Sequence, residues 1–172
     1  MARRGDEALE ELYAAHYRGL VRLAMLLVAD VGTAEEVVQD AFVAMHRRWS
    51  SLREPDKALA YLRQSVVNGA RSSLRRRGVR ERHAALVRVD EGVLPGADEH
   101  ALIAERRAAV LDALRDLPQR QREVIALRYY LDLSEADIAT TLGISRGAVK
   151  SHASRGAAAL RAVLGPTLEE TR

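Results

Sequence analysis

The sequence predicts an all-α protein with two small helical domains, a flexible linker between them and a helix-turn-helix in the C-terminal domain. Hydrophobic residues make up 48% of the 172 residues, but aromatic residues only 4%. The cores must therefore be built from Leu, Val, Ala and Ile, which favours helix bundles over sheets. Apolar residues recur at spacings of three and four, the period of a buried helix face. Gly and Pro gather between Gly78 and Asp98, where they predict the linker.

The first domain is expected in residues 1–78 and contains three helices. These span about 6–29, 34–49 and 57–77. Thr33 is expected to cap the second helix, and Glu36, three residues later, to complete a capping box. A loop at 50–56 precedes the third helix, which ends in an Arg cluster. The positions expected to face the core are Leu9, Leu12, His16, Leu20, Leu23, Leu27, Val38, Ala41, Phe42, Met45, Trp49, Leu59, Leu62, Val66, Ala70 and Leu74.

The second domain is expected in residues 99–164, after a linker at 79–98 and before a short tail at 165–172. The expected helix starts are Asp98, Pro118, Ser134 and Ser145. Asp and Ser are common N-caps, and Pro is favoured in a first helical turn. The positions expected to face the core are Leu102, Ala109, Val110, Ala113, Leu114, Val124, Ile125, Leu127, Leu131, Ile138, Ala139, Leu142, Ala148, Val149, Ala153, Leu160 and Leu164.

The segment from Glu135 to Arg155 has the residue pattern of a helix-turn-helix. Ala139 is small enough for a helix to cross closely, and Gly143 tolerates the positive φ that the turn requires. Ile144 and Val149 are expected to fill the wedge between the helices. The outward positions of the second helix are Arg146, Gly147, Lys150, Ser151, Ser154 and Arg155. Such a helix presents its N-terminal residues to the major groove of DNA. The alternative is a solvated basic helix on an ordinary bundle.

The net charge of +3 is unevenly distributed along the chain. Residues 61–90 hold eight Arg or Lys residues against two acids, and residues 145–161 hold four against none. Between them, residues 91–116 hold three against six. Two basic segments separated by an acidic one indicate a polyanion bound at two places. Nearly all of the cations are Arg, which pairs with phosphate and guanine better than Lys does.

Several classes of protein are excluded by what the sequence lacks. Without cysteine there are no disulfides, thiol nucleophiles or Cys-based zinc sites, which fits a reducing cytoplasm. The N-terminus turns acidic where a signal peptide needs apolar residues, and no apolar run reaches membrane-spanning length. We therefore expect a soluble, cytoplasmic protein. The five histidines lack metal-ligand spacing, so we expect no metal site and no cofactor.

Residues 143–147 match the G-x-S-x-G pattern of serine hydrolases. In those enzymes the serine follows a strand and needs a later acid and histidine. Here a short helix is predicted before Ser145, and His152 is the only histidine that follows it. Ser145 is better explained as an N-cap. We therefore expect no enzymatic activity.

Two blocks of the sequence resemble the bacterial RNA polymerase sigma factors of the small extracytoplasmic-function (ECF) type. Residues 117–151 contain LPQRQREV, LRYY, IA, LGIS and VKS in that order and resemble region four of this family. Residues 34–42, AEEVVQDAF, and the later Ala60-Tyr61-Leu62, Asn68 and Arg75-Arg76 resemble its region two. The resemblance covers nearly the whole chain except the linker and the last few residues.

The resemblance implies a factor that directs RNA polymerase to specific promoters and assists promoter opening. The residues expected at the minus-thirty-five element are Ser145, Arg146, Gly147, Lys150, Ser151 and Arg155. Those expected at the minus-ten element are Tyr61, Asn68, Arg71, Arg75 and Arg76, with the loop at 50–56 beside an extruded base. Those expected to bind core polymerase are Glu35, Glu36, Gln39 and Asp40. The implied partners are core RNA polymerase, double-stranded promoter DNA, its melted single strand and an anti-sigma factor, at the nucleoid and without membrane insertion.

Simpler explanations exist for these surfaces. A helix dipole favours acids in a first turn and accounts for Glu35 and Glu36, but not for the rest of the polymerase-binding set. For the six cations between residues 71 and 82, which stand against Glu81 alone, the simpler explanation is a solvated helix end. For Tyr61, the simpler explanation is a core position. For the whole chain, one alternative is a regulator that acts without polymerase, although such proteins usually carry an α/β receiver domain. The other is a nucleic-acid enzyme, for which no carboxylate cluster, P-loop or metal-ligand set is present.

Overall fold

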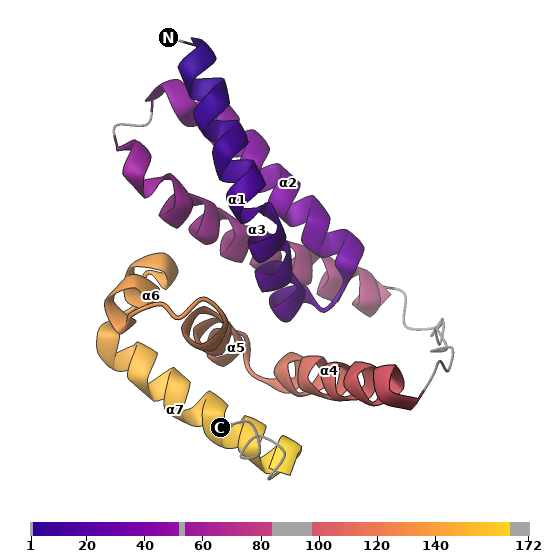
Figure 1. The fold of residues 1–172 in the computed structure, drawn as a ribbon. Helices are drawn as coiled ribbons and strands as arrows, with labels where there is room; N and C mark the ends of the chain where they lie inside the picture. The colour runs from indigo at the N-terminus through magenta and orange to yellow at the C-terminus, as the bar shows by residue number, and fades with distance from the viewer. Residues whose placement is uncertain (1, 52–53, 84–97, 166–172) are drawn as a thin grey trace.

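The computed structural model describes residues 2–51, 54–83 and 98–165, and the described residues are almost entirely helical. The elements are α1 (Ala2–Val28), α2 (Val31–Arg48), η1 (Trp49–Ser51), η2 (Pro55–Lys57), α3 (Ala58–His83), α4 (Asp98–Asp116), α5 (Gln119–Ile125), η3 (Ala126–Tyr130), α6 (Glu135–Leu142) and α7 (Arg146–Leu164). Figure 1 shows α1–α3 as one helical half and α4–α7 as another beneath it. The predicted all-α fold is confirmed.

The first half is a bundle of α1, α2 and α3 around an aliphatic core. Leu23, Met45 and Leu62, one from each helix, are fully buried. Gly69 lets α3 approach α2 closely, because a Cβ at this position would lie 2.9 Å from Cγ1 of Val37. Some positions expected in the core are only partly buried, since solvent reaches the edges of so small a bundle. These are Leu9, Leu12, His16, Trp49, Leu59 and Leu74.

Helix α2 begins earlier than predicted, because Asp30 rather than Thr33 caps it. The Asp30 carboxylate accepts the backbone N–H of Thr33 at 2.8 Å and its hydroxyl at 2.5 Å. These hydrogen bonds, the hydroxyl's first, lower the pKa of Asp30 below its ordinary value of 3.8. The chain turns at Ala29, which has φ 55 and directly precedes this cap. Val31 and Gly32 are therefore helical, and the capping box expected at Thr33 does not form.

Helix α3 runs to His83, so residues 79–83 of the predicted linker are helical. A single glycine, Gly78, is tolerated inside a helix, and the Arg residues around it are good helix formers. The rest of the predicted linker, residues 84–97, lies outside the described residues, as do residues 52–53 of the predicted loop and residues 166–172 of the tail.

The helix expected to start at Pro118 and to include Leu131 is divided in two. Pro118 is its N-cap rather than its first helical residue, and α5 gives way after Ile125 to the π-helical stretch η3. The wider spacing of a π-helix ends the regular hydrogen bonding and turns the chain toward α6. Gly156 allows α7 to pack directly on α5, since a Cβ there would lie 2.8 Å from Cγ1 of Ile125.

Helix α4 contributes less to the core than predicted. Ala113 and Leu114 are buried near its C-terminal end, but Ala109 and Val110 are exposed. Leu114, in the last turn of α4, joins a small cluster with Leu117 and Ile125, while the side chain of Leu102 lies outside the described residues. In α7, Val149 and Ala153 are buried as expected, whereas the remaining expected positions are partly buried. Those positions are Ala148, Leu160 and Leu164.

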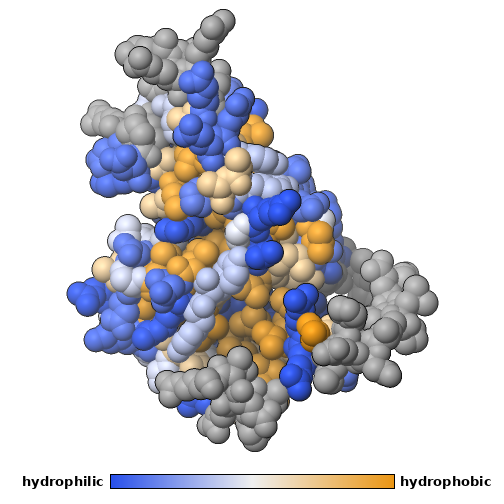
Figure 2. Space-filling view, viewed as in Figure 1, coloured by the Kyte–Doolittle hydropathy of each residue, from blue (hydrophilic) through white to orange (hydrophobic). Residues whose placement is uncertain are grey.

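The two halves pack directly against each other, a contact that the sequence does not predict. One continuous buried cluster contains Leu27 and Ala70 from the first half and Val124 and Leu127 from the second. Burial lowers the pKa of Arg63 on α3, and the charge of Asp137 on α6 raises it in part. Figure 2 shows hydrophobic side chains gathered across the middle of the lower half, over α5 and beside α7, with hydrophilic side chains at the margins. None of the helices within the described ranges is long and apolar enough to cross a lipid bilayer.

Candidate nucleic-acid interface

Two serine N-caps and one left-handed glycine define the helix-turn-helix. The Oγ atoms of Ser134 and Ser145 each accept the backbone N–H three residues later, at 3.1 Å, and thereby start α6 and α7. Gly143 has φ 65 and ψ 38, and its N–H donates to the Ala139 carbonyl. The next N–H, from Ile144, donates to the same carbonyl at 3.1 Å. The N-caps and the positive φ predicted from the sequence are confirmed.

The wedge between α6 and α7 is filled by aliphatic side chains. Ile138 and Leu142 of α6 and Val149 of α7 are buried, while Ala139 and Ile144 are partly buried against the same core. The chain turns sharply between the two helices (Figure 1). Because one face of α7 is held against α5 and α6, the other face is left on the outside.

The outside of α7 carries the positions predicted to contact the minus-thirty-five element. Arg146 and Lys150 lie one turn apart and are exposed. Ser145, Gly147, Ser151 and Arg155 are exposed as well. The Ser145 hydroxyl is engaged as the N-cap, and Arg155 Nε donates to the Ser151 carbonyl at 3.3 Å. The side chain of Lys150 is 66% exposed. The result is a basic surface at a helix N-terminus, which is the polarity that DNA phosphates require.

Glu135 is an acidic neighbour of this surface that sequence reasoning missed. It lies at the start of α6, with Oε2 3.8 Å from Nζ of Lys150 and Oε1 3.5 Å from Nη1 of Arg128. Local sequence patterns do not indicate this pair, because Glu135 and Lys150 are 15 residues apart and lie on different helices. Glu135 therefore orients Lys150 and moderates the positive charge at the start of α7.

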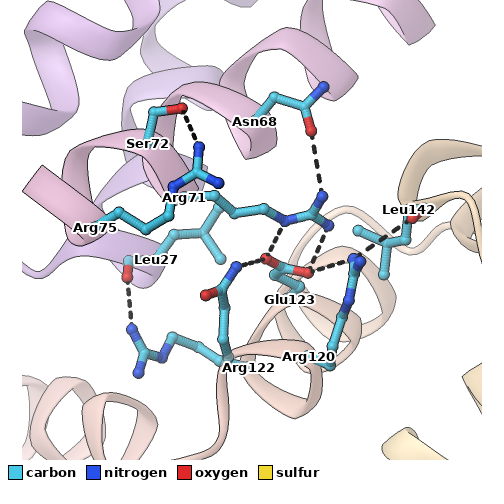
Figure 3. Close-up of polar contacts among 10 residues, drawn as sticks. Leu27, Asn68, Arg71, Ser72, Arg75, Arg120, Arg122, Glu123 and Leu142 are labelled. Carbon is cyan, nitrogen blue, oxygen red and sulfur yellow. Dashed lines mark hydrogen bonds and ion pairs between the residues drawn. The ribbon is translucent and has the colours of Figure 1, made fainter.

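The predicted minus-ten residues lie along α3, with unequal exposure. Asn68, Arg75 and Arg76 are exposed, but the Arg71 side chain is only 19% exposed. Arg71 Nη1 donates to Asn68 Oδ1 at 3.3 Å, and Arg75 Nη2 donates to Ser72 Oγ at 3.1 Å. Arg71 also forms an ion pair with Glu123 on α5, whose Oε1 lies 2.6 Å from Arg71 Nε (Figure 3).

Tyr61, the remaining member of the set, is half-buried against the core of the first half. Arg48 Nη1 donates to its hydroxyl at 3.4 Å, and the Arg48 guanidinium carbon lies 5.3 Å from the ring centroid. The ring is thus partly a core residue and partly a platform for a cation.

A polar hollow of about 380 Å³ lies between the start of α2 and the end of α3. Its polar lining consists of Asp30, Thr33, Glu36, Ser73, Arg76, Arg77 and Arg80. It brings together Glu36, predicted to bind core polymerase, and Arg76, predicted to bind DNA. The two predicted surfaces of the first half therefore adjoin.

Both halves of the chain match one known family. Residues 12–80 match Sigma-70 region 2, and residues 107–160 match Sigma-70, region 4. The chain belongs to the sigma-70 family of RNA polymerase sigma factors. Such a factor directs RNA polymerase to promoters at transcription initiation.

Curated relatives place this sigma factor in the ECF group. It is 35% identical over 162 residues to the ECF RNA polymerase sigma factor SigM of Mycobacterium tuberculosis strain H37Rv, covering 94% of this chain and 80% of SigM. It is 33% identical over 152 residues to the RNA polymerase sigma-E factor of Streptomyces avermitilis, covering 88% of this chain and 82% of that protein. The resemblance found in the sequence is confirmed.

Solved structures share the fold of the sigma factor. The structure of CnrH in complex with the cytosolic domain of CnrY has a TM-score of 0.72 and 25% identity, with 96% of each chain covered. The sigma factor RpoE of Bartonella quintana, in complex with the anti-sigma factor NepR, has a TM-score of 0.73 and 24% identity, with 90% of this chain and 95% of that chain covered.

The acidic residues on α2 of the sigma factor are exposed together. Glu35, Glu36, Gln39 and Asp40 all face solvent. The intervening Ala34, Val37, Val38 and Ala41 are buried against α1 and α3. The helix therefore presents one polar face whose position is set by the core beneath it.

Glu123 and Arg122 are two extensively hydrogen-bonded residues of the sigma factor that were not predicted from the sequence. Glu123 is buried, and Arg122 donates to four backbone carbonyls from both halves. The sequence did contain a signal for the burial of Glu123. It lies four positions before Leu127, a predicted core residue, and therefore on the same inward face of the helix. An acid on an inward face requires a buried cationic partner.

Proposed function

We propose that α7 binds the major groove of the minus-thirty-five element, with Arg146 and Lys150 nearest the base edges. The observation that carries this assignment is the geometry of the turn. Gly143 and Ser145 direct α7 away from α6 and leave its N-terminal basic face exposed. Two cations one turn apart suit a guanine edge and an adjacent phosphate. Gly147 and Ser151 on the same face allow close approach to the backbone.

The exposed side of α3 is proposed to bind the minus-ten element. Asn68 would lie nearest the bases, with Arg75 and Arg76 along the phosphate backbone. Tyr61, at the edge of the core, offers a ring against which an unstacked base can pack. The Arg cluster continues toward the end of α3, which supports a contact that follows the phosphate backbone of one DNA strand.

The acidic face of α2 is proposed to dock on core RNA polymerase. Glu35, Glu36, Gln39 and Asp40 supply carboxylate and amide groups on one exposed helix face. The opposite, buried face of α2 packs in the core and thereby sets the direction in which these four side chains point. The domain division proposed earlier follows from these roles: residues 1–78 serve polymerase and the minus-ten element, and residues 99–164 serve the minus-thirty-five element.

The sigma factor is proposed to supply specificity and no bond chemistry, without a cofactor, while it works at the nucleoid. An anti-sigma factor is proposed as a further partner. The support for it is the likeness to CnrH, whose structure was solved in complex with the cytosolic domain of CnrY.

A reconstituted run-off transcription assay tests the proposed function. The purified chain is added to core polymerase with genomic DNA fragments, and promoter-specific transcripts are scored. The expected result is discrete transcripts that require both components. Transcription from core polymerase that does not change when the chain is added would overturn the proposal.

The same assay addresses the polymerase-binding surface. A Glu35→Arg, Asp40→Arg double variant is expected to lose transcripts together with binding to core polymerase, measured by co-migration on a sizing column. The matched control is Glu11→Arg, a charge reversal at an exposed position of α1. Equal loss in the control would remove α2 from the proposal.

A further inference from the structure

Glu135 joins two cations beside the exposed basic face of α7. Its Oε1 atom lies 3.5 Å from Nη1 of Arg128, and its Oε2 atom lies 3.8 Å from Nζ of Lys150. Arg128 belongs to η3, Glu135 to the first turn of α6 and Lys150 to α7. Each carboxylate oxygen is therefore close to one cation, and the three side chains form a charged bridge across the helix-turn-helix.

The carboxylate is the most sheltered member of this bridge. The side chain of Glu135 is 24% exposed, whereas that of Arg128 is 39% exposed and that of Lys150 is 66% exposed. The position also suits an acid, because Glu135 directly follows the Ser134 N-cap and lies at the positive end of the α6 dipole. The acid is thus held at the helix start, and the lysine ammonium is the group that reaches outward.

Arg128 is held on two sides and keeps Glu135 in place. Its guanidinium carbon lies 5.9 Å from the ring centroid of Tyr129, within the range of a cation–π contact, while Nη1 approaches Glu135. Arg128 therefore fixes one oxygen of the carboxylate. The other oxygen is left for the more exposed and more flexible Lys150.

The ammonium group of Lys150 can keep this partner and still contact a base. An ammonium has three donors, so one can point to Glu135 while the others reach acceptors such as N7 and O6 of guanine. A phosphate is a different partner, because it brings a second negative charge next to the carboxylate and the two anions repel each other. A lysine without an acidic neighbour is a mobile point charge that binds either group.

We propose that Glu135 is a specificity-determining residue for the minus-thirty-five element, which holds Lys150 toward the base edges and disfavours its transfer to a phosphate. This inference rests on the proposed role of α7. Glu135 is a positioning residue in this scheme, since it acts through Lys150. It lowers the affinity for DNA of any sequence and raises the preference for the correct element.

Binding of holoenzyme to two labelled promoter duplexes tests the proposal. One duplex has the upstream element intact, and in the other this element is scrambled. In Glu135→Gln the affinity for the scrambled duplex is expected to rise more than that for the intact one. The ratio of the two affinities should fall by about threefold to fivefold, the size of an exposed ion pair. An unchanged ratio, or an equal gain on both duplexes, would overturn the proposal.

The salt dependence of the same binding reports the released cations. For the scrambled duplex, the slope of log affinity against log salt concentration should become steeper in Glu135→Gln by about 1 for each cation that gains a phosphate. A residue that only supported the fold would change the affinities without steepening this slope. A slope equal to that of wild type would therefore count against the proposal.

Asp132→Asn is the matched control for the loss of one negative charge. Asp132 is exposed three residues before Glu135, and none of the described ion pairs includes it. Its φ of 51 is tolerated by Asn. Asp132→Asn should keep the wild-type ratio of affinities. A fall as large as that in Glu135→Gln would mean that total charge, and not the contact with Lys150, sets the preference.

A double variant assigns the effect to Lys150. In a Lys150→Ala background, Glu135→Gln is expected to leave the ratio of affinities unchanged, because the side chain through which Glu135 acts is gone. An undiminished effect in this background would overturn the proposal. Circular dichroism reports helix content, and Glu135→Ala is a second variant with the same expected result, since Ala is the best helix former.

The wild-type holoenzyme separates this inference from the proposed function. If wild type binds the intact and scrambled duplexes equally, the proposed role of α7 fails and the inference fails with it. If wild type prefers the intact duplex and Glu135→Gln prefers it to the same degree, the inference alone fails and the role of α7 stands.

Discussion

Gly143 holds the turn of the helix-turn-helix in a backbone conformation that other residues adopt at a cost. Its φ of 65 lies in the left-handed region, while no atom lies within 4 Å of a Cβ at this position. The cost of a side chain is therefore purely conformational. Gly143→Ala is expected to lower the free energy of unfolding by about 1–2 kcal/mol, measured by urea denaturation. Gly143→Asn should lose less, since Asn tolerates this region. Equal losses for Ala and Asn would contradict this explanation.

Asp30 makes the start of α2 sensitive to acid. Because its pKa is lowered in the folded protein, the folded state binds fewer protons than the unfolded state. The stability from the cap is present at neutral pH and is lost as the pH falls through the lowered pKa. Asp30→Ala is expected to cost about 1 kcal/mol at pH 7, and the difference from wild type should shrink below the ordinary Asp pKa of 3.8.

Thermal unfolding across the pH range measures this difference. Asp30→Asn is the matched control, because an amide oxygen still caps the helix but does not titrate. Its stability relative to wild type should improve as the pH falls. A difference between Asp30→Ala and wild type that stays constant down to pH 3 or so would argue against Asp30 as the cap.

At the scale of elements, Gly156 sets how closely α7 lies on α5. A Cβ there would meet Ile125 Cγ1 at 2.8 Å, which is part of a buried side chain. Gly156→Ala is expected to cost about 1–3 kcal/mol, as overpacking does, whereas Gly19→Ala, with nothing within 4 Å, should gain roughly 0.5–1 kcal/mol.

Urea denaturation of a double variant isolates the contact. Ile125→Ala removes the atom that the new methyl group would meet, so Gly156→Ala should cost less in that background than in wild type. Strict additivity of the two changes would mean that the helices do not touch at Gly156.

Elements with strong local signals were predictable from the sequence. Ser134, Gly143 and Ser145 act through atoms within three or four residues of themselves, and all three were placed correctly. The predicted start of α2 was wrong because Asp30 and Thr33 are both suitable caps, and the choice between them depends on where α1 ends. The division after Ile125 was missed because a π-helical turn has no residue signature in this segment.

At the scale of the whole molecule, the packing of the two halves could not be predicted from local sequence patterns. Arg71 and Glu123 are 52 residues apart, and Arg122 and Leu27 are 95 apart. Neither helix periodicity nor capping carries information at such separations. The family resemblance did identify the two halves and their order, and the matches to regions 2 and 4 confirm it. The roles of individual site residues remain predictions.

The basic face of α7 is the centre of this account, and its promoter selectivity can be measured directly. Holoenzyme containing Arg146→Ala is compared with wild type on a responsive promoter whose upstream element is intact or scrambled. We predict a loss of run-off transcript of about 5- to 150-fold on the intact promoter, the equivalent of about 1–3 kcal/mol, and no further loss on the scrambled one. Arg161→Ala, exposed near the other end of α7, should behave as wild type. An equal proportional loss on both promoters would contradict the assignment of α7 to the minus-thirty-five element.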